Sequence, residues 1–102
     1  MEKETGPTTT MMLRHAYLAE SLVPNPLPTR DAGVLYTVRD ARAYLLALPP
    51  YRERRNHWQR AGQLIQEEAH VEAVSQQFHR ALFMDGKLDV EAFERMSGVG
   101  GS

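Results

Sequence analysis

The prolines constrain this chain more than any other feature, because they divide it into segments that cannot join into one helix. Proline lacks an amide hydrogen and its ring clashes with the preceding turn, so helices usually end at or before it. Pro24, Pro26 and Pro28 alternate with other residues and predict an extended strap. A second break, Pro49-Pro50, ends the helical pattern that follows the strap. We therefore expect a helix, a strap and then further helices.

Apolar residues at helical spacing predict the remaining elements. The expected helices cover residues 11–22, 38–48, 52 or 54 to 69, 71–84 and 90–96. Thr37 and Asp40 resemble a capping box at the start of the second helix. No glycine or proline marks a break near His70, so the two helices that flank it are either separate or one long helix.

The strap contains one short segment with the composition of a strand. Val34, Leu35 and Tyr36 are β-formers, but no second strand candidate accompanies them, so we assign them to the strap. The predicted fold class is all-α: a small irregular bundle of four to five helices with an extended, proline-containing strap between helices 1 and 2.

Length and composition predict one domain. The chain has 102 residues, of which 42% are hydrophobic and 25% charged. We expect a disordered N-terminal tail over residues 1–10, a single helical domain over 11–96 and a flexible C-terminal tail over 97–102. A chain this small buries a modest core, which leaves room for a homo-oligomer.

Composition also suggests where the protein works. There is no cysteine, the first residues lack the basic and apolar pattern of a signal peptide, and no run approaches the about 18 apolar residues of a membrane span. We therefore expect a cytoplasmic protein without a membrane partner. Arginine outnumbers lysine ten to two, which is typical of a bacterial proteome with an arginine-rich composition.

Charge is distributed unevenly along the chain. Residues 39–60 carry six arginines against two acidic residues, and residues 61–95 carry seven acidic residues against three basic ones. If the fold separates these segments, one face attracts anions and the opposite face repels them. If the segments pack side by side, their charges neutralise each other. The net charge of -1 slightly favours the second arrangement.

The candidate partner-binding site lies in the basic segment. Arginine, tryptophan and tyrosine are enriched at the hot spots of protein interfaces. The candidate residues are Tyr51, Arg52, Arg54, Arg55, His57, Trp58 and Arg60, extended by Arg39 and Arg42 on the preceding helix. The alternative interpretation is that Trp58 is a core residue and that the arginines form a solvated rim around it. Burial of Trp58 distinguishes the two interpretations.

The sequence offers no convincing catalytic or cofactor site. Glu67 and His70 have the Glu-x-x-His spacing of di-iron bundles, but a second copy is lacking because Gln76 stands where a carboxylate is required. No phosphate-binding glycine motif and no nucleophile motif occurs. We therefore expect no metal, no cofactor and no enzymatic activity.

Taken together, the residues favour a small, non-enzymatic binding or regulatory protein. We expect it to dock on another protein through the helix that contains the arginines and the tryptophan. The alternative is a nucleic-acid-associated factor that uses the basic patch from Arg39 to Arg60. Against that alternative, the chain has an isoelectric point of about 6.4, whereas dedicated nucleic-acid-binding domains usually exceed about 9.

Overall fold

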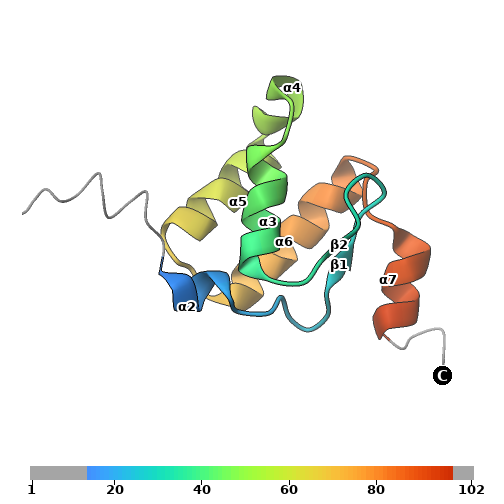
Figure 1. The fold of residues 1–102 in the computed structure, drawn as a ribbon. Coiled ribbons are helices and arrows are strands. Elements are labelled where there is room, and N and C mark those ends of the chain that lie inside the picture. Colours follow the sequence, from blue (N-terminus) through green and yellow to red (C-terminus); the bar gives the residue numbers. More distant parts are fainter. Residues whose placement is uncertain (1–13, 98–102) are drawn as a thin grey trace, which may run out of the picture.

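Two antiparallel helices, α5 and α6, make the most extensive contact between elements of the fold (Figure 1). The computed structural model describes residues 14–97. Its helices are α2 (His15–Leu18), α3 (Val38–Leu46), α4 (Pro50–Glu53), α5 (Asn56–Gln66), α6 (Val71–Met84) and α7 (Val90–Ser97), and its strands are β1 (Leu27–Pro28) and β2 (Val34–Leu35). Helix α3 packs on α5 and α6, and α7 packs beside β1. The prediction of a mostly helical domain is confirmed.

The start of α3 lies where the sequence predicts it. Thr37 is the N-cap: its hydroxyl accepts a hydrogen bond from the amide of Asp40 (3.2 Å), and the Asp40 carboxylate accepts one from the amide of Thr37 (3.3 Å). Both bonds satisfy amides that a helix N-terminus leaves without partners. A capping box therefore forms with aspartate in place of the more usual glutamate.

The strap contains a small sheet, so the prediction that Val34–Leu35 has no strand partner is wrong. Leu27 pairs with Leu35 and Pro28 with Val34 in an antiparallel arrangement. The Pro28 carbonyl accepts a hydrogen bond from the amide of Asp89 (3.0 Å). Proline is tolerated here because Pro28, which has no amide hydrogen to donate, takes part in this contact only as an acceptor. The sheet turns two leucines, Leu27 and Leu35, into the core.

The first helix is shorter than predicted. Of the expected range 11–22, residues 11–13 lie outside the described part, and α2 ends at Leu18. The chain then becomes extended, and the amide of Leu22 donates to the carbonyl of Tyr36 (2.9 Å). Leu22 is nevertheless buried. Leu22 therefore reaches the core through the pairing of an extended segment with the strap, and not as part of a helix. The predicted tail over residues 1–10 and residues 98–102 of the other predicted tail also lie outside the described residues.

The expected third helix, from Arg52 or Arg54 to Ala69, is shorter than predicted, because α5 begins at Asn56 and ends at Gln66. A break at Arg54 and Arg55 separates it from the short helix α4, which contains Arg52. A second break separates α5 from α6, where Glu68 adopts a positive φ of 52°. The carbonyl of Ala69 in this turn accepts a hydrogen bond from the Tyr17 hydroxyl (2.7 Å). The alternative of one long helix through His70 is therefore excluded.

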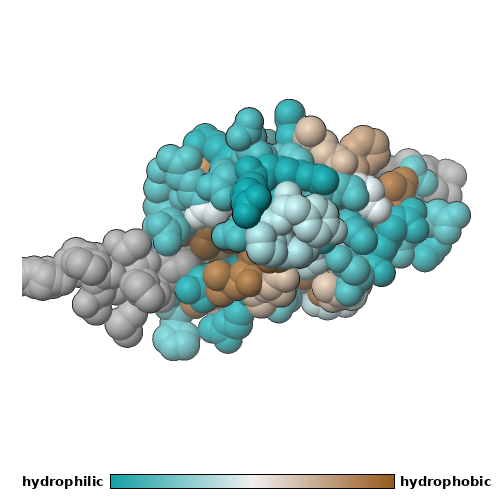
Figure 2. Space-filling model, turned by 90° about the horizontal axis from the view of Figure 1, so that it is seen from above, coloured by the Kyte–Doolittle hydropathy of each residue, from teal (hydrophilic) through white to brown (hydrophobic). Residues whose placement is uncertain are grey.

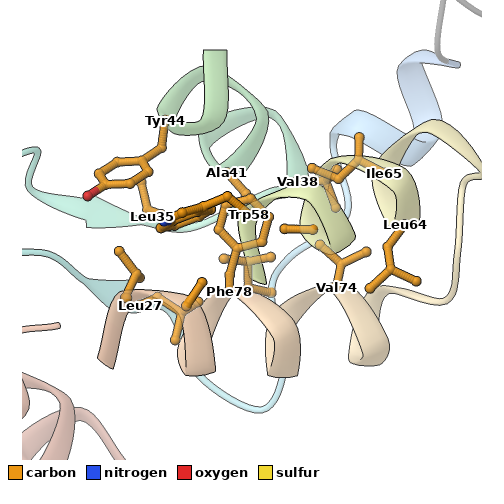
Figure 3. Packing of buried hydrophobic residues seen from close by; sticks show 14 of the residues in the cluster. Leu27, Leu35, Val38, Ala41, Tyr44, Trp58, Leu64, Ile65, Val74 and Phe78 are labelled. Atoms are coloured by element: carbon orange, nitrogen blue, oxygen red, sulfur yellow. The ribbon is translucent and has the colours of Figure 1, made fainter. Parts of the chain in front are cut away.

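Trp58 lies at the centre of the core (Figure 3). It is 1% exposed and contacts the rings of Tyr44 and Phe78, with centroid distances of 5.6 and 5.4 Å. The buried hydrophobic residues are Tyr17, Leu22, Leu27, Leu35, Val38, Ala41, Tyr44, Leu48, Trp58, Ala61, Leu64, Ile65, Val74, Phe78, Ala81, Leu82 and Leu88. Every helix except α4 and α7, and both strands, contribute to this cluster.

Candidate partner-binding site

The site is organised by Asp85, which follows the last residue of α6. Its side chain is 1% exposed. The Oδ2 atom accepts hydrogen bonds from Arg52 Nε (2.7 Å) and Trp58 Nε1 (2.7 Å). The Oδ1 atom accepts from Arg55 Nη1 (2.6 Å) and lies 2.9 Å from His57 Nε2. Because a carboxylate offers only acceptors, His57 Nε2 must carry the hydrogen in this contact.

These four contacts keep Asp85 ionised. Burial alone disfavours the charged carboxylate and raises its pKa. Hydrogen bonds from Trp58, Arg52, His57 and Arg55 outweigh that effect and hold the pKa well below its usual range. A buried carboxylate with two arginine partners is therefore a fixed negative charge in this fold.

Arg52 connects Asp85 to a second acidic residue. Its Nη2 donates to the Tyr44 hydroxyl (2.9 Å), and that hydroxyl donates to Asp31 at 3.0 and 3.2 Å. Arg52 Nη1 also lies 3.4 Å from Asp31. The guanidinium carbon sits 5.6 and 5.7 Å from the ring centroids of Tyr44 and Trp58. Arg52 is therefore held on several sides, and α4 is fixed to the body of the protein.

The structure divides the predicted partner-binding residues into two groups. Arg52 and Trp58 are buried, and His57 is mostly covered, so a partner cannot reach these side chains without displacing others. Their position matches the interpretation in which Trp58 belongs to the core.

A second group of predicted residues faces outward. It consists of Tyr51, Arg54, Arg55, Arg60 and Arg39 as exposed side chains, with Arg42 half-buried. Arg55 belongs to both groups, since its side chain is 45% exposed although it pairs with Asp85, and its guanidinium lies 6.0 Å from the Tyr51 ring centroid. Arg39 Nη2 is 3.4 Å from His15 Nδ1. The predicted cluster is thus not one continuous surface.

The outward group includes an apolar component on α4 and the end of α3. Tyr51 is 65% and Leu46 is 69% exposed, on either side of the Pro49-Pro50 turn. Arg54 makes no side-chain hydrogen bond or ion pair within residues 14–97. Seen from above, with α4 toward the viewer, this side is mainly hydrophilic with hydrophobic atoms exposed in places (Figure 2). We call Leu46, Tyr51, Arg54 and Arg55 the α4 surface.

Sequence reasoning missed Asp85 and Tyr44 as parts of this site. The helix predicted over residues 71–84 ends just before Asp85, and the donors to Asp85 lie 27 to 33 residues earlier in the chain. The one available signal was the opposite charge of the two segments. Asp85 pairs with Arg52 and Arg55, so the arrangement in which the segments pack side by side is the observed one.

Two other kinds of site are absent from residues 14–97. No three histidine, cysteine, aspartate or glutamate side chains there lie close enough together to hold a metal ion. No helix in this range is long and apolar enough to cross a membrane. No protein-family model, curated protein or solved structure matches the chain.

Proposed function

We propose that this protein is a small, non-enzymatic binding protein that docks on another protein through the α4 surface. The observation that carries the proposal is the exposure of Tyr51 and Leu46 beside Arg54, which has no ion-pair partner within the described residues. Tyrosine and arginine are the residue types that most often dominate binding energy at protein interfaces. We place this activity in the bacterial cytoplasm, as the composition suggests.

Rigidity supports this function. Tyr51 of the α4 surface lies on a single turn of helix, and Arg54 and Arg55 follow this turn directly. Such a turn would fray in isolation. Arg52 fixes this turn from beneath through Asp85, Tyr44 and Asp31. A surface that is ordered before binding loses less conformational entropy when a partner arrives. The buried arginine, Arg52, therefore holds the exposed residues of the α4 surface in place.

The charged and apolar side chains of the α4 surface indicate what kind of protein surface would bind there. Arg54 and the exposed part of Arg55 favour an acidic rim, and the rings and methyl groups of Tyr51 and Leu46 favour an apolar centre. A protein surface with an apolar pocket bordered by aspartate or glutamate fits this combination. Nucleic acid fits this surface less well, because two of the arginines, Arg52 and Arg55, are already paired with Asp85 and offer less positive charge to phosphates.

The test compares three forms of the protein in capture from an extract of the source organism, followed by binding of the purified partner. Tyr51→Ser/Arg54→Glu should lose the partner and raise the Kd at least about tenfold, as is common when a hot spot is removed. Arg30→Glu, an exposed arginine on the turn between β1 and β2, is the matched control and should bind like the wild type.

Three outcomes would contradict the proposal. The first is a partner that both variants retain equally. The second is salt-sensitive binding to nucleic acid that the double variant abolishes, which would support the nucleic-acid alternative. The third is self-association through the α4 surface as its sole role, seen as a dimer that the double variant converts to a monomer.

A further inference from the structure

Two hollows on the outer side of α6 meet at shared residues. The first, of about 330 Å³, lies between the strap, α6 and α7. The second, of about 280 Å³, lies between α5 and α6. Gln76 and Arg80 line both. The two hollows are therefore neighbours that share these two side chains, and we call the pair the groove; none of its lining residues belongs to the α4 surface.

The first hollow is mainly apolar. Val23, Pro24 and Leu27 of the strap line one side, and Phe93 of α7 lines another. The Phe93 ring packs against His79 with a centroid distance of 4.8 Å. Small-molecule sites are commonly apolar hollows of about 300 Å³ or more that contain a few polar groups. This hollow suits an apolar chain or ring.

The second hollow is polar and basic. Arg60 of α5 and Arg80 of α6 line it, together with Gln76 and Gln77. The Gln77 side-chain amide donates to the His57 carbonyl (2.9 Å), which fixes its position. Neither arginine side chain makes a hydrogen bond or ion pair within residues 14–97.

Arg60 and Arg80, like Arg54, differ from the arginines that are paired with carboxylates. Arg14, Arg52 and Arg55 each pair with a carboxylate at 2.6 or 2.7 Å. Arg60 and Arg80 instead face a common hollow with like charges, which repel each other. An anion between them removes this repulsion and can accept paired hydrogen bonds from the planar guanidinium groups.

We propose that this groove binds an amphipathic anion, with its carboxylate or phosphate head between Arg60 and Arg80 and its apolar body in the hollow beside Phe93. Arg80 stands at the junction of the two hollows, so it contacts the head while its methylene groups border the body. The head alone lacks the apolar contact, and the body alone leaves the arginines without a counter-ion. The site therefore requires both parts in one molecule.

The test is titration with octanoate and octyl phosphate as monomers, followed by the amide NMR shifts of residues 75–80. Both parts of the groove should shift together and saturate. The double variant Arg60→Gln/Arg80→Gln should weaken binding at least tenfold, and Arg30→Gln should leave it unchanged. The tighter of the two ligands identifies the head as carboxylate or phosphate.

A chain-length series from butyrate to octanoate gives a second measurement that needs no variant. Affinity should rise with length until the hollow beside Phe93 is filled. Equal affinity for octanol would show that the arginines play no part, and equal affinity for acetate or inorganic phosphate would show that the apolar hollow plays none. Either result overturns the proposal, as does an absence of saturable shifts with both octyl probes.

Discussion

The two ends of the α5–α6 pair are held together by different chemistry. At the end where the turn joins the helices, Leu64, Ile65 and Val74 pack as apolar side chains. At the opposite end, the buried carboxylate of Asp85 accepts hydrogen bonds from Arg52, Trp58 and two further donors. Apolar packing tolerates conservative changes, whereas a buried charge depends on every partner. The two ends should therefore respond very differently to small substitutions.

The largest effect is expected from Asp85→Asn. An amide has one oxygen, so its NH2 group would face either Arg52 and Trp58 or Arg55 and His57, and two donors would lose their acceptor. Breaking a buried ion pair costs about 3 to 5 kcal/mol. At the apolar end, Ile65→Val should cost only about 0.5 to 1.5 kcal/mol. Denaturant unfolding monitored by circular dichroism measures both values.

Equal losses in these two variants would remove the distinction between the two ends. Should Asp85→Asn fail to fold, Trp58→Phe provides a milder comparison. That change keeps an aromatic ring in the core and removes one of the two donors to Asp85 Oδ2 together with some volume. Its free-energy loss should still exceed that of Ile65→Val.

The second-largest effect is expected from acid, which should lower the stability that Asp85 provides. The unfolded carboxyl has a pKa of about 3.9, and the folded pKa lies well below that range. A depressed folded pKa gives stability that is present above the unfolded pKa and is lost as the pH falls toward the folded pKa. The free energy of unfolding should therefore decline below about pH 4. Urea unfolding at intervals between pH 2.5 and 6.5 measures the decline.

Asp85→Asn supplies the control for this acid effect. Its unfolding free energy should depend less steeply on pH than that of the wild type, because the titrating group is missing. Parallel curves for the two proteins would assign the acid sensitivity to other carboxylates and separate it from the Asp85 end.

Structure that depends on neighbouring residues was predictable from the sequence, and structure that depends on distant segments was not. Helical spacing identified α6 over its full length and the capping box of α3, because both depend on residues within a few positions of each other. It failed where distant segments decide the structure. The pairing of Leu27 with Leu35 replaces a continuous strap, and the extended path of Leu22 replaces the end of a helix.

The candidate site shows the same division. The sequence identified the arginines and the tryptophan of the site. It did not show which of these side chains face inward, because that depends on Asp85, which lies about 30 residues further along the chain. Arg52 and Arg54 are two positions apart on one short segment, yet Arg52 is buried and Arg54 is exposed. Residues two apart on a helix point in different directions. The break between α4 and α5 and the position of Asp85 therefore decide which arginine remains available to a partner.

The smallest effect is expected from Ser75→Ala, which tests a neutral buried polar group near the apolar end. The Ser75 hydroxyl donates to the Val71 carbonyl (2.8 Å) and accepts from the Val23 amide (3.0 Å), and so ties the strap to α6. Its loss leaves the Val23 amide without a partner and should cost about 1 kcal/mol, which is the smallest loss among the polar substitutions and is similar to that of Ile65→Val. Thermal unfolding measures this cost, and hydrogen exchange at Val23 should become faster. A loss as large as that of Asp85→Asn would show that a neutral buried group is as important as the charged one. The expected difference instead assigns the sensitivity of the Asp85 end to its charge.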